Sequence, residues 1–261
     1  MGQAWYDCDW DEPVEITELK KSNLLQDTLV FDIGAHHGVV AMILASEVGK
    51  NGKVIAVEAS GHNAEVARRN SQLNNFSQIE VLHTAVSDRD GTIVINETLN
   101  SQLDDGSGSW GRQSVPAMTV DSLAQRYGQP DVVFIDVEGA ECLALQGASQ
   151  SLKSAAAFLI EVHVGCGLEK LGASVEQLLA FFPPDQFAIT IRGAEDKSFR
   201  EPASNDSAFQ SRFFLLAQRV RAYARTVAEH LTSNLDAGGR KKYESCLRRL
   251  NHSSSEMTRN I

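Results

Sequence analysis

Short runs of hydrophobic residues, rich in β-branched side chains, recur along the chain up to residue 218. They lie at Leu29–Ile33, 53–57, 132–137, 158–162, 187–191 and 213–217. Longer stretches with helical spacing of hydrophobic residues lie between them, at Val39–Val48, 64–73, 121–127, 141–152 and 175–182. Strands with few polar residues are typical of a parallel sheet that helices cover on both faces. The alternation therefore predicts an α/β fold with a doubly wound, mostly parallel sheet.

The stretch 81–120 departs from this alternation. It contains two strand-like pieces, at 92–95 and 115–120, which flank a polar loop at 100–112. A loop of this length inside a compact domain is usually functional or disordered. We therefore expect Trp110 either to cover a substrate or to lie at a disordered tip.

The composition changes after residue 218. Residues 219–261 carry nine Lys or Arg and four Asp or Glu, whereas the whole chain has 24 basic and 34 acidic residues and a formal charge of -10. The spacing of hydrophobic residues from Val220 to Leu231 predicts one amphipathic helix, followed by a frayed tail. The predicted organisation is an N-terminal segment at 1–28, a domain at 29–218, and a basic helix and tail at 219–261.

Charge and composition exclude several classes of protein. An acidic surface argues against non-specific binding to nucleic acid, which depends on neutralising phosphates. No run approaches the roughly 18 apolar residues of a membrane span, and no secretory signal is visible. The four cysteines form no CxxC pair that would indicate a zinc ribbon or a disulfide framework. We therefore expect a cytoplasmic protein with no transmembrane segment and no nucleic-acid partner.

A glycine turn follows the first predicted strand, within VFDIGAHHG at 30–38. Gly34 permits a close approach of backbone and ligand, and the following helix N-terminus offers N–H donors to an anionic group. Glu58 ends the next strand, where an acid can accept both hydroxyls of a ribose. The alternatives are a glycine needed for packing alone and an ordinary loop acid. Together the two features favour a nucleoside site.

The residues around this turn indicate which nucleoside is bound. The second glycine of a dinucleotide fingerprint is missing, because Ala35 and His36 follow Gly34. Asp32, directly before the turn, would repel a diphosphate but suits a ligand with an ammonium group. The charge pattern therefore favours S-adenosylmethionine over a nicotinamide dinucleotide.

Three acids, Asp136, Glu138 and Glu141, come after the hydrophobic run VVFI. Grouped acids are costly unless a cation, a proton or hydrogen-bond donors offset them, so they often mark a site. Glu141 alone would also suit the first turn of a helix. His163 ends the next strand, with Glu161 on the same side. It would be either a general base or a hydrogen-bonded structural histidine.

These motifs, in this order, resemble those of the FkbM family of S-adenosylmethionine-dependent methyltransferases. The resemblance covers about residues 29–163 and rests on VFDIGAHHG, VIAVEAS, RRNSQLNN, TAVSDRDGTI, VDSL, FIDVEGAE and IEVH. It implies a class I methyltransferase fold, whose Rossmann-like sheet has seven strands and one antiparallel edge strand. The residues that it implies in cofactor binding are Asp32, Gly34, Ala35 and Gly38 at the methionine end, Glu58 at the ribose, and Ala59 and Ala85 beside the adenine.

Two departures from the family pattern affect these expectations. Family members commonly have proline where this chain has Ala59, which we expect to alter adenine packing only slightly. The segment before residue 29 is short, so the acceptor site would be more open or completed by a partner subunit in a homodimer.

We expect O-methylation of a hydroxyl on a sugar, glycolipid or secondary metabolite, so that the partner is a small-molecule or glycan acceptor. Asp136 or His163 would act as the base, and Glu138 and Glu141 would orient the acceptor. No metal is predicted at the adjacent His36 and His37, which cannot easily chelate one ion. A divalent cation held by Asp136, Glu138 and Glu141 is an open alternative.

Two other functions share part of this pattern. A nicotinamide-dependent oxidoreductase has the same sheet and ribose acid, but the glycine fingerprint is missing. A non-catalytic protein could keep the methyltransferase fold and bind a partner. A nucleic-acid methyltransferase is disfavoured, because the catalytic region is acidic and no Asn/Asp-Pro-Pro-Tyr/Phe element follows the fourth strand.

Overall fold

The computed structural model describes residues 12–96, 102–103 (main chain alone) and 111–220. Trp110, most of the polar loop around it, and nearly all of the predicted basic helix and tail lie outside the described residues. The chain divides into two compact units, Met1–Arg219 and Val220–Ile261. The fold and the site described below belong to the first unit.

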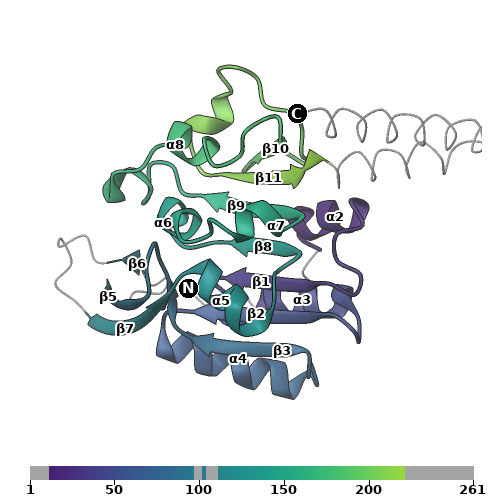
Figure 1. Cartoon of the computed structure of the whole chain (residues 1–261), viewed down its shortest axis with the longest axis vertical. Coiled ribbons are helices and arrows are strands. Elements are labelled where there is room, and N and C mark those ends of the chain that lie inside the picture. Colours follow the sequence, from purple (N-terminus) through teal and green to yellow (C-terminus); the bar gives the residue numbers. More distant parts are fainter. Residues whose placement is uncertain (1–11, 97–101, 104–110, 221–261) are drawn as a thin grey trace, which may run out of the picture. The chain divides into compact units, whose positions relative to one another are not determined.

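Seven strands form the main sheet, which Figure 1 shows stacked from β10 at the top to β3 at the bottom. In spatial order they are β10 (Phe187–Gly193), β11 (Phe213–Arg219), β9 (Ala157–Val162), β8 (Val132–Ile135), β1 (Leu29–Ile33), β2 (Lys53–Glu58) and β3 (Ile79–His83). The strands from β9 to β3 pair in parallel, and β11 pairs antiparallel with both β9 and β10. The predicted doubly wound, mostly parallel α/β sheet is confirmed, and its antiparallel strand is β11, next to the edge strand β10.

Helices cover both faces of this sheet. One hydrophobic core includes residues of α5 (Val120–Tyr127), α6 (Glu141–Gln146) and α8 (Val175–Leu179), and the other includes residues of α2 (Val14–Lys21) and α3 (Val39–Val48). Within β1, Phe31 and Ile33 belong to the first core and Val30 to the second. Alternate side chains of one strand therefore fill opposite cores, which explains why the strands are hydrophobic throughout. The remaining helices are α4 (Gly61–Leu73), α7 (Ser151–Ser154), η1 (Glu169–Leu171) and η2 (Ser207–Gln210).

A second sheet, which the sequence did not predict, contains four strands. Their order is β4 (Ala85–Val86), β7 (Arg112–Met118), β5 (Gly91–Asn96) and β6 (Gln102–Leu103). The strand predicted at 115–120 ends at Met118, because Thr119 is the N-cap of α5. The Thr119 side chain accepts the N–H of Ser122 at 3.0 Å and so caps the helix.

Three other predicted boundaries are wrong. The strand predicted at 132–137 ends at Ile135, and the chain turns where Glu138 adopts a positive φ of 51°. The helix predicted at 141–152 breaks after Gln146, where a Cβ on Gly147 would lie 2.3 Å from the backbone oxygen of Ser87. The helix predicted at 175–182 ends at Leu179. Two consecutive prolines follow it at 183–184, and proline disfavours helical backbone in the residue before it.

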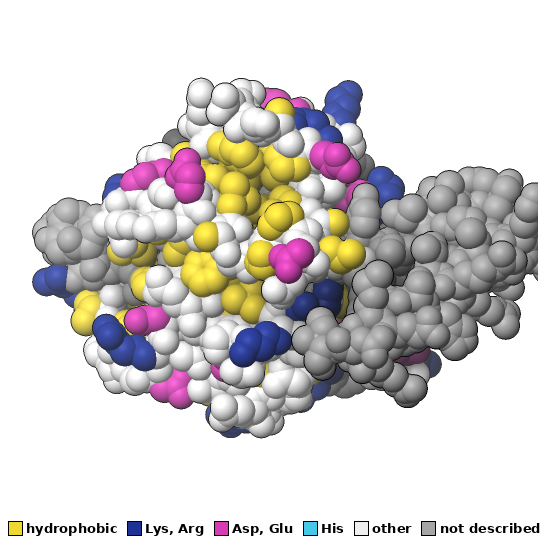
Figure 2. Space-filling model, turned by 45° about the horizontal axis from the view of Figure 1, so that its top comes forward, with side chains coloured by type: hydrophobic (Ala, Val, Ile, Leu, Met, Phe, Trp, Pro, Cys, Tyr) yellow, Lys and Arg dark blue, Asp and Glu magenta, His cyan; other side chains and the backbone are white. Residues whose placement is uncertain are grey.

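The surface near the β10 edge combines hydrophobic and charged side chains. Figure 2 shows hydrophobic side chains gathered at the centre of this face, with Lys, Arg, Asp and Glu side chains around them. The large hydrophobic side chains exposed in the described part of the chain are Leu73, Val94 and Val220. No helix among the described residues is long and apolar enough to cross a bilayer.

Candidate active site

A cavity of about 1300 Å³ lies at the carboxyl ends of the central strands. Residues that the sequence predicted line one part of its wall, namely Gly34, Ala35, Glu58, Ala59, Ala85, Asp136 and Glu138. Residues from more distant elements line another part, namely Pro13, Glu15, Ile16, Arg192, Arg212 and Phe214. The carboxyl ends of parallel strands are the edge at which doubly wound proteins bind ligands. The cavity is therefore the candidate active site.

The glycine turn after β1 lies directly against the end of β8. Gly34 has a φ of 92°, and a Cβ there would lie 1.7 Å from the backbone oxygen of Asp136. Only glycine fits this position. Gly38 has a φ of 81°, and a Cβ there would lie 3.1 Å from the Cβ of Ala67. Gly38 does not line the cavity, and its lack of a side chain serves the packing of α3 against α4.

Glu58 is held rigidly at the end of β2. Its Oε2 accepts the N–H of His36 at 2.8 Å, and its Oε1 accepts the N–H of Ser60 at 2.8 Å. Only 6% of the residue is exposed, yet it lines the cavity. A carboxylate oxygen can accept more than one hydrogen bond, so Glu58 could also accept a pair of neighbouring hydroxyl groups.

Asp32 lies deeper, and it does not line the cavity. It is 1% exposed, and its buried Oδ2 has no hydrogen-bond partner among the residues that the structure describes. Burial, and next the negative charge of Glu58, raise the pKa of Asp32 to about 7. A cationic group bound close to this buried carboxyl group would stabilise its ionised form.

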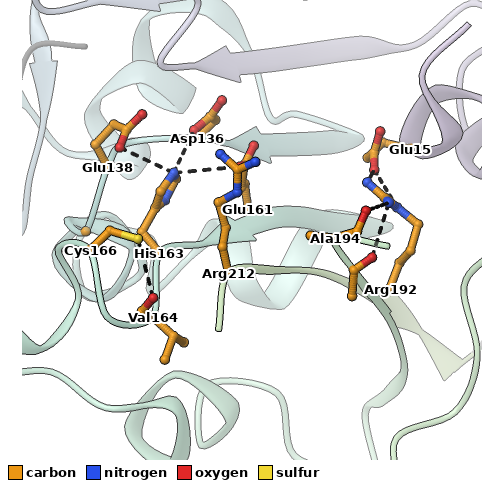
Figure 3. Close-up of polar contacts among 12 residues, drawn as sticks. Glu15, Asp136, Glu138, Glu161, His163, Val164, Cys166, Arg192, Ala194 and Arg212 are labelled. Atoms are coloured by element: carbon orange, nitrogen blue, oxygen red, sulfur yellow. Dashed lines mark hydrogen bonds and ion pairs between the residues drawn. The ribbon is translucent and has the colours of Figure 1, made fainter. Parts of the chain in front are cut away.

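His163 lies at the centre of a group of acids after β9, and it is 2% exposed. Its Nδ1 is 2.6 Å from Glu141 Oε1, which also accepts the N–H of Gly139 at 3.0 Å. Its Nε2 is 3.5 Å from Glu138 Oε2, 3.6 Å from Asp136 Oδ1 and 3.8 Å from Glu161 Oε1. Figure 3 shows the ring pointing towards these carboxylates. Glu141 pairs with the other ring nitrogen of His163, and it does not line the cavity.

The charges in this cluster change one another's ionisation. Burial lowers the pKa of His163, but Glu141, Glu138 and Asp136 reverse this effect and raise it to about 9. Burial, and next the charge of Glu161, raise the pKa of Asp136 well above its ordinary value. Burial also raises the pKa of Glu161, although Arg212 Nε lies 3.1 Å from its Oε1. The surrounding acids therefore favour positive charge at the position of His163.

Glu15 and Arg192 meet at another part of the cavity wall. Arg192 donates to Glu15 Oε1 through Nε at 2.7 Å and also through Nη2, as drawn in Figure 3. The same guanidinium lies 4.5 Å from the ring centroid of Phe214. The side chains are 8% and 11% exposed, so this ion pair joins α2 to β10 with little solvent around it.

The sequence therefore predicted part of this cluster and missed part of it. The structure brings Asp136, Glu138, Glu141 and His163 together, but Glu161 joins them as well. The alternation in IEVH already put Glu161 on the side of His163, which was the available signal. Arg192, Arg212 and Glu15 lie on elements far apart in the chain, and no local pattern links them.

The sheet and its edge define the class of protein: a doubly wound α/β protein with a cavity at the carboxyl ends of its strands and an acid–histidine cluster beside it. A family model for the methyltransferase FkbM domain matches residues 32–186, which is more than half of the chain. The chain belongs to the FkbM methyltransferase family. This membership confirms the family expected from the sequence motifs.

Solved structures of several methyltransferases resemble the chain at low identity. A methyltransferase FkbM from Methylobacillus flagellatus is 16% identical, with a TM-score of 0.49, over 74% of this chain and 44% of that one. A SAM-dependent methyltransferase from Aquifex aeolicus is 16% identical, with a TM-score of 0.45, over 80% and 95% of the two chains. A SAM-dependent O-methyltransferase from Thermotoga maritima is 13% identical, with a TM-score of 0.45, over 83% and 69%. No match was found among curated protein sequences.

The predicted cofactor, S-adenosylmethionine, agrees with the family and fits the residues present. Asp32 stands two residues before Gly34, and its buried Oδ2, which lacks a partner among the described residues, suits the expected ammonium group. Glu58 is buried, fixed by two N–H donors and open to the cavity, which suits a ribose diol. Ala59 and Ala85 line the same cavity and leave room for a flat base.

Proposed function

We propose that this protein transfers the methyl group of S-adenosylmethionine to a hydroxyl group of a small molecule or glycan. The acceptor classes that we consider are sugars, glycolipids and secondary metabolites. The observation that carries the proposal is the position of Asp136. Its carboxyl group lines the cavity, while its backbone oxygen contacts the cofactor turn at Gly34. A proton acceptor therefore lies beside the expected site of the methyl group.

The size of the cavity supports binding of two ligands together. Sites for one drug-sized molecule have volumes of roughly 300–1,000 Å³, and this cavity has about 1300 Å³. The wall beyond Asp136 carries Glu138, Glu161, Arg192 and Arg212. These side chains can donate and accept hydrogen bonds, so they suit a methyl acceptor with several hydroxyl groups.

Each residue of the cluster has a distinct role in this proposal. The cofactor supplies an electrophilic methyl group, so the protein mainly has to align donor and acceptor. Asp136 removes the hydroxyl proton, and Glu138 orients the acceptor. His163 is the weaker candidate for the base, because it is buried outside the cavity wall with Nδ1 already bonded to Glu141. Glu141 orients His163 and does not touch the acceptor.

The N-terminal segment contributes to the acceptor side of the cavity in this proposal. Pro13, Glu15 and Ile16 line the same cavity as the turn residues Gly34 and Ala35. This contact supports the expectation that 1–28 covers the acceptor. A homodimer that completes the site remains a prediction, and sedimentation analysis would test it.

The test is a screen of hydroxyl-bearing acceptors with S-adenosylmethionine, read by mass spectrometry as a gain of one methyl group. With an accepted substrate, we expect Asp136→Asn to lower kcat by about 10²–10⁴-fold, the usual contribution of a general base. The dissociation constant of S-adenosylmethionine should change little. Asp185→Asn, which removes an exposed acid between α8 and β10, is the matched control and should behave like the wild type.

Three results would contradict parts of the proposal. Wild-type turnover in Asp136→Asn would show that Asp136 is not the base. Cofactor binding without methylation across a broad acceptor panel would favour the non-catalytic alternative. Calorimetric titration that detects NAD but not S-adenosylmethionine would favour the oxidoreductase.

A further inference from the structure

We propose that Asp136, Glu161 and His163 form a binding site for one divalent transition-metal ion at the acceptor end of the cavity. One carboxylate oxygen of each acid and one ring nitrogen of the histidine all lie within 4.8 Å of one another. The site differs from the set Asp136, Glu138 and Glu141 that was considered from the sequence, because Glu161 and His163 take the places of Glu138 and Glu141. Glu141 is fully buried behind the histidine ring.

The distances around His163 Nε2 suit a shared ion better than a proton. Among the described residues Nε2 forms no hydrogen bond, although three carboxylate oxygens lie 3.5–3.8 Å from it. A proton on Nε2 would draw one acceptor to about 2.7–2.9 Å. Two ligands bound at about 2.1 Å in a tetrahedral arrangement are about 3.4 Å apart. The Nε2–Asp136 distance of 3.6 Å is close to that value.

The other ring nitrogen is already fixed in the way that metal-binding histidines require. Nδ1 pairs with Glu141 Oε1 at 2.6 Å, and the N–H of Gly139 holds the same oxygen at 3.0 Å. Metal-ligating histidines almost always donate their second N–H to a carboxylate or carbonyl, which orients the ring. Glu141 therefore acts as a positioning residue that directs Nε2 towards Asp136 and Glu161.

The charge of the cluster also favours a cation. Asp136, Glu138 and Glu161 surround one imidazole, and Arg212 pairs with Glu161 from a side chain that is 54% exposed. Three carboxylates in a low-dielectric wall repel one another unless positive charge offsets them. An ion between Asp136, Glu161 and His163 would offset this repulsion more effectively than a half-exposed guanidinium.

The ligand types indicate the class of ion. An imidazole nitrogen with two carboxylate oxygens suits Mn²⁺ or Zn²⁺, whereas Mg²⁺ and Ca²⁺ prefer oxygen ligands alone. Three protein ligands leave a coordination position open, as in catalytic sites. Asp136 and Glu161 line the cavity, so this position would face the acceptor. If the proposed function holds, an acceptor hydroxyl bound there would lose its proton more readily, to a carboxylate oxygen that does not bind the ion.

The experiment measures metal binding alone, without cofactor or acceptor. The whole protein is stripped with EDTA, dialysed and titrated with Mn²⁺, Zn²⁺ or Mg²⁺ by calorimetry, and the Mn²⁺ complex is also observed by electron paramagnetic resonance. We expect one Mn²⁺ or Zn²⁺ ion per chain, with Mg²⁺ binding at least tenfold more weakly. Glu161→Gln and His163→Ala should each weaken binding more than tenfold. Glu141→Gln should weaken it about 10–100-fold through the orientation of the ring.

Glu65→Gln is the matched control, because the Glu65 side chain is 74% exposed on α4. It should bind metal as the wild type does, and circular dichroism would verify that every variant folds. The proposal is overturned if the wild type binds no metal ion stoichiometrically. It is also overturned if the folded variants Glu161→Gln and Asp136→Asn bind metal as tightly as the wild type. Metal binding without methylation would support this site and contradict the proposed function. Methylation by a protein that binds no metal would support the proposed function and contradict this metal site.

Discussion

Two acids at the ends of neighbouring strands, Asp32 and Glu58, have opposite surroundings in this protein. Glu58 receives the N–H groups of His36 and Ser60, each at 2.8 Å. Asp32, buried next to it, has an oxygen with no donor, and its pKa rises to about 7. The difference follows from the turns after β1 and β2, which direct donors to one acid only. The two acids therefore differ in charge state although they end neighbouring strands.

Replacing Asp32 by Asn should make the protein more stable at neutral pH and weaken cofactor binding. The pKa of Asp32 is raised in the folded state, so its ionisation costs stability increasingly from about pH 4 to pH 7. We expect Asp32→Asn to gain about 1–4 kcal/mol in the free energy of unfolding at pH 8, and little at pH 4. Urea denaturation at both values checks this. An equal gain at pH 4 and pH 8, or an equal pH dependence in the control Asp185→Asn, would contradict it.

At the scale of elements, one acid at the start of α5 organises the broken helix that follows β8. Asp121 accepts the N–H groups of Gln150 and Ser151 and the hydroxyls of Ser149 and Ser151, all within 3.0 Å. Burial raises the pKa of Asp121, but these hydrogen bonds outweigh it and hold the pKa below its ordinary value. Asp121 thereby joins α5 to α7 and compensates for the break at Gly147.

Removing this carboxylate should destabilise the domain. We expect Asp121→Ala to lower the free energy of unfolding at pH 7 by about 1–3 kcal/mol, because four hydrogen bonds lose their acceptor, two of them from the buried residue Ser151. The contribution is present above about pH 4 and is lost as the pH falls through the lowered pKa of the folded protein. Denaturation from pH 7 to pH 3 measures both effects. Ser149→Ala removes one of the four hydrogen bonds and should cost less. A loss that does not depend on pH would argue against the carboxylate's role.

At the scale of the molecule, the ion pair of Glu15 and Arg192 joins residues 177 positions apart. It connects α2 to β10 across the sheet edge and forms part of the cavity wall. Arg192 also donates to the backbone oxygens of Gly193, Ala194 and Asp196. The N-terminal helix and the last strands are therefore coupled through one guanidinium in the cavity wall.

Breaking this pair from either side should cost more than removing it entirely. Glu15→Gln or Arg192→Met leaves a buried charge without its partner, and we expect each to lose about 3–5 kcal/mol of unfolding free energy. The double variant should lose less than either single variant, because the two charges are removed together. Urea denaturation of the wild type, the two single variants and the double variant completes a double-mutant cycle. Additive losses would show that the two side chains are not coupled.

The FkbM resemblance and the alternation of hydrophobic strands and helices predicted the seven-stranded α/β sheet. Parallel strands end at one edge, so the positions of Glu58, Asp136 and His163 in the chain already indicated that they lie near one another. The four-stranded second sheet was missed because its pairing depends on contacts between β4, β5, β6 and β7 that no local pattern specifies. The helix break at Gly147 was missed because it results from contact with Ser87 and Thr119.

The sequence by itself determined which acids and glycines stand at the strand ends, because strand periodicity and turn chemistry are local properties. Only the tertiary structure decided which of those acids reaches the cavity. Glu141 turns inward to His163, whereas Glu161 shares the cavity wall with Asp136. The reason is that burial and hydrogen-bond partners come from elements distant in the chain, and these set the direction and the charge of each side chain.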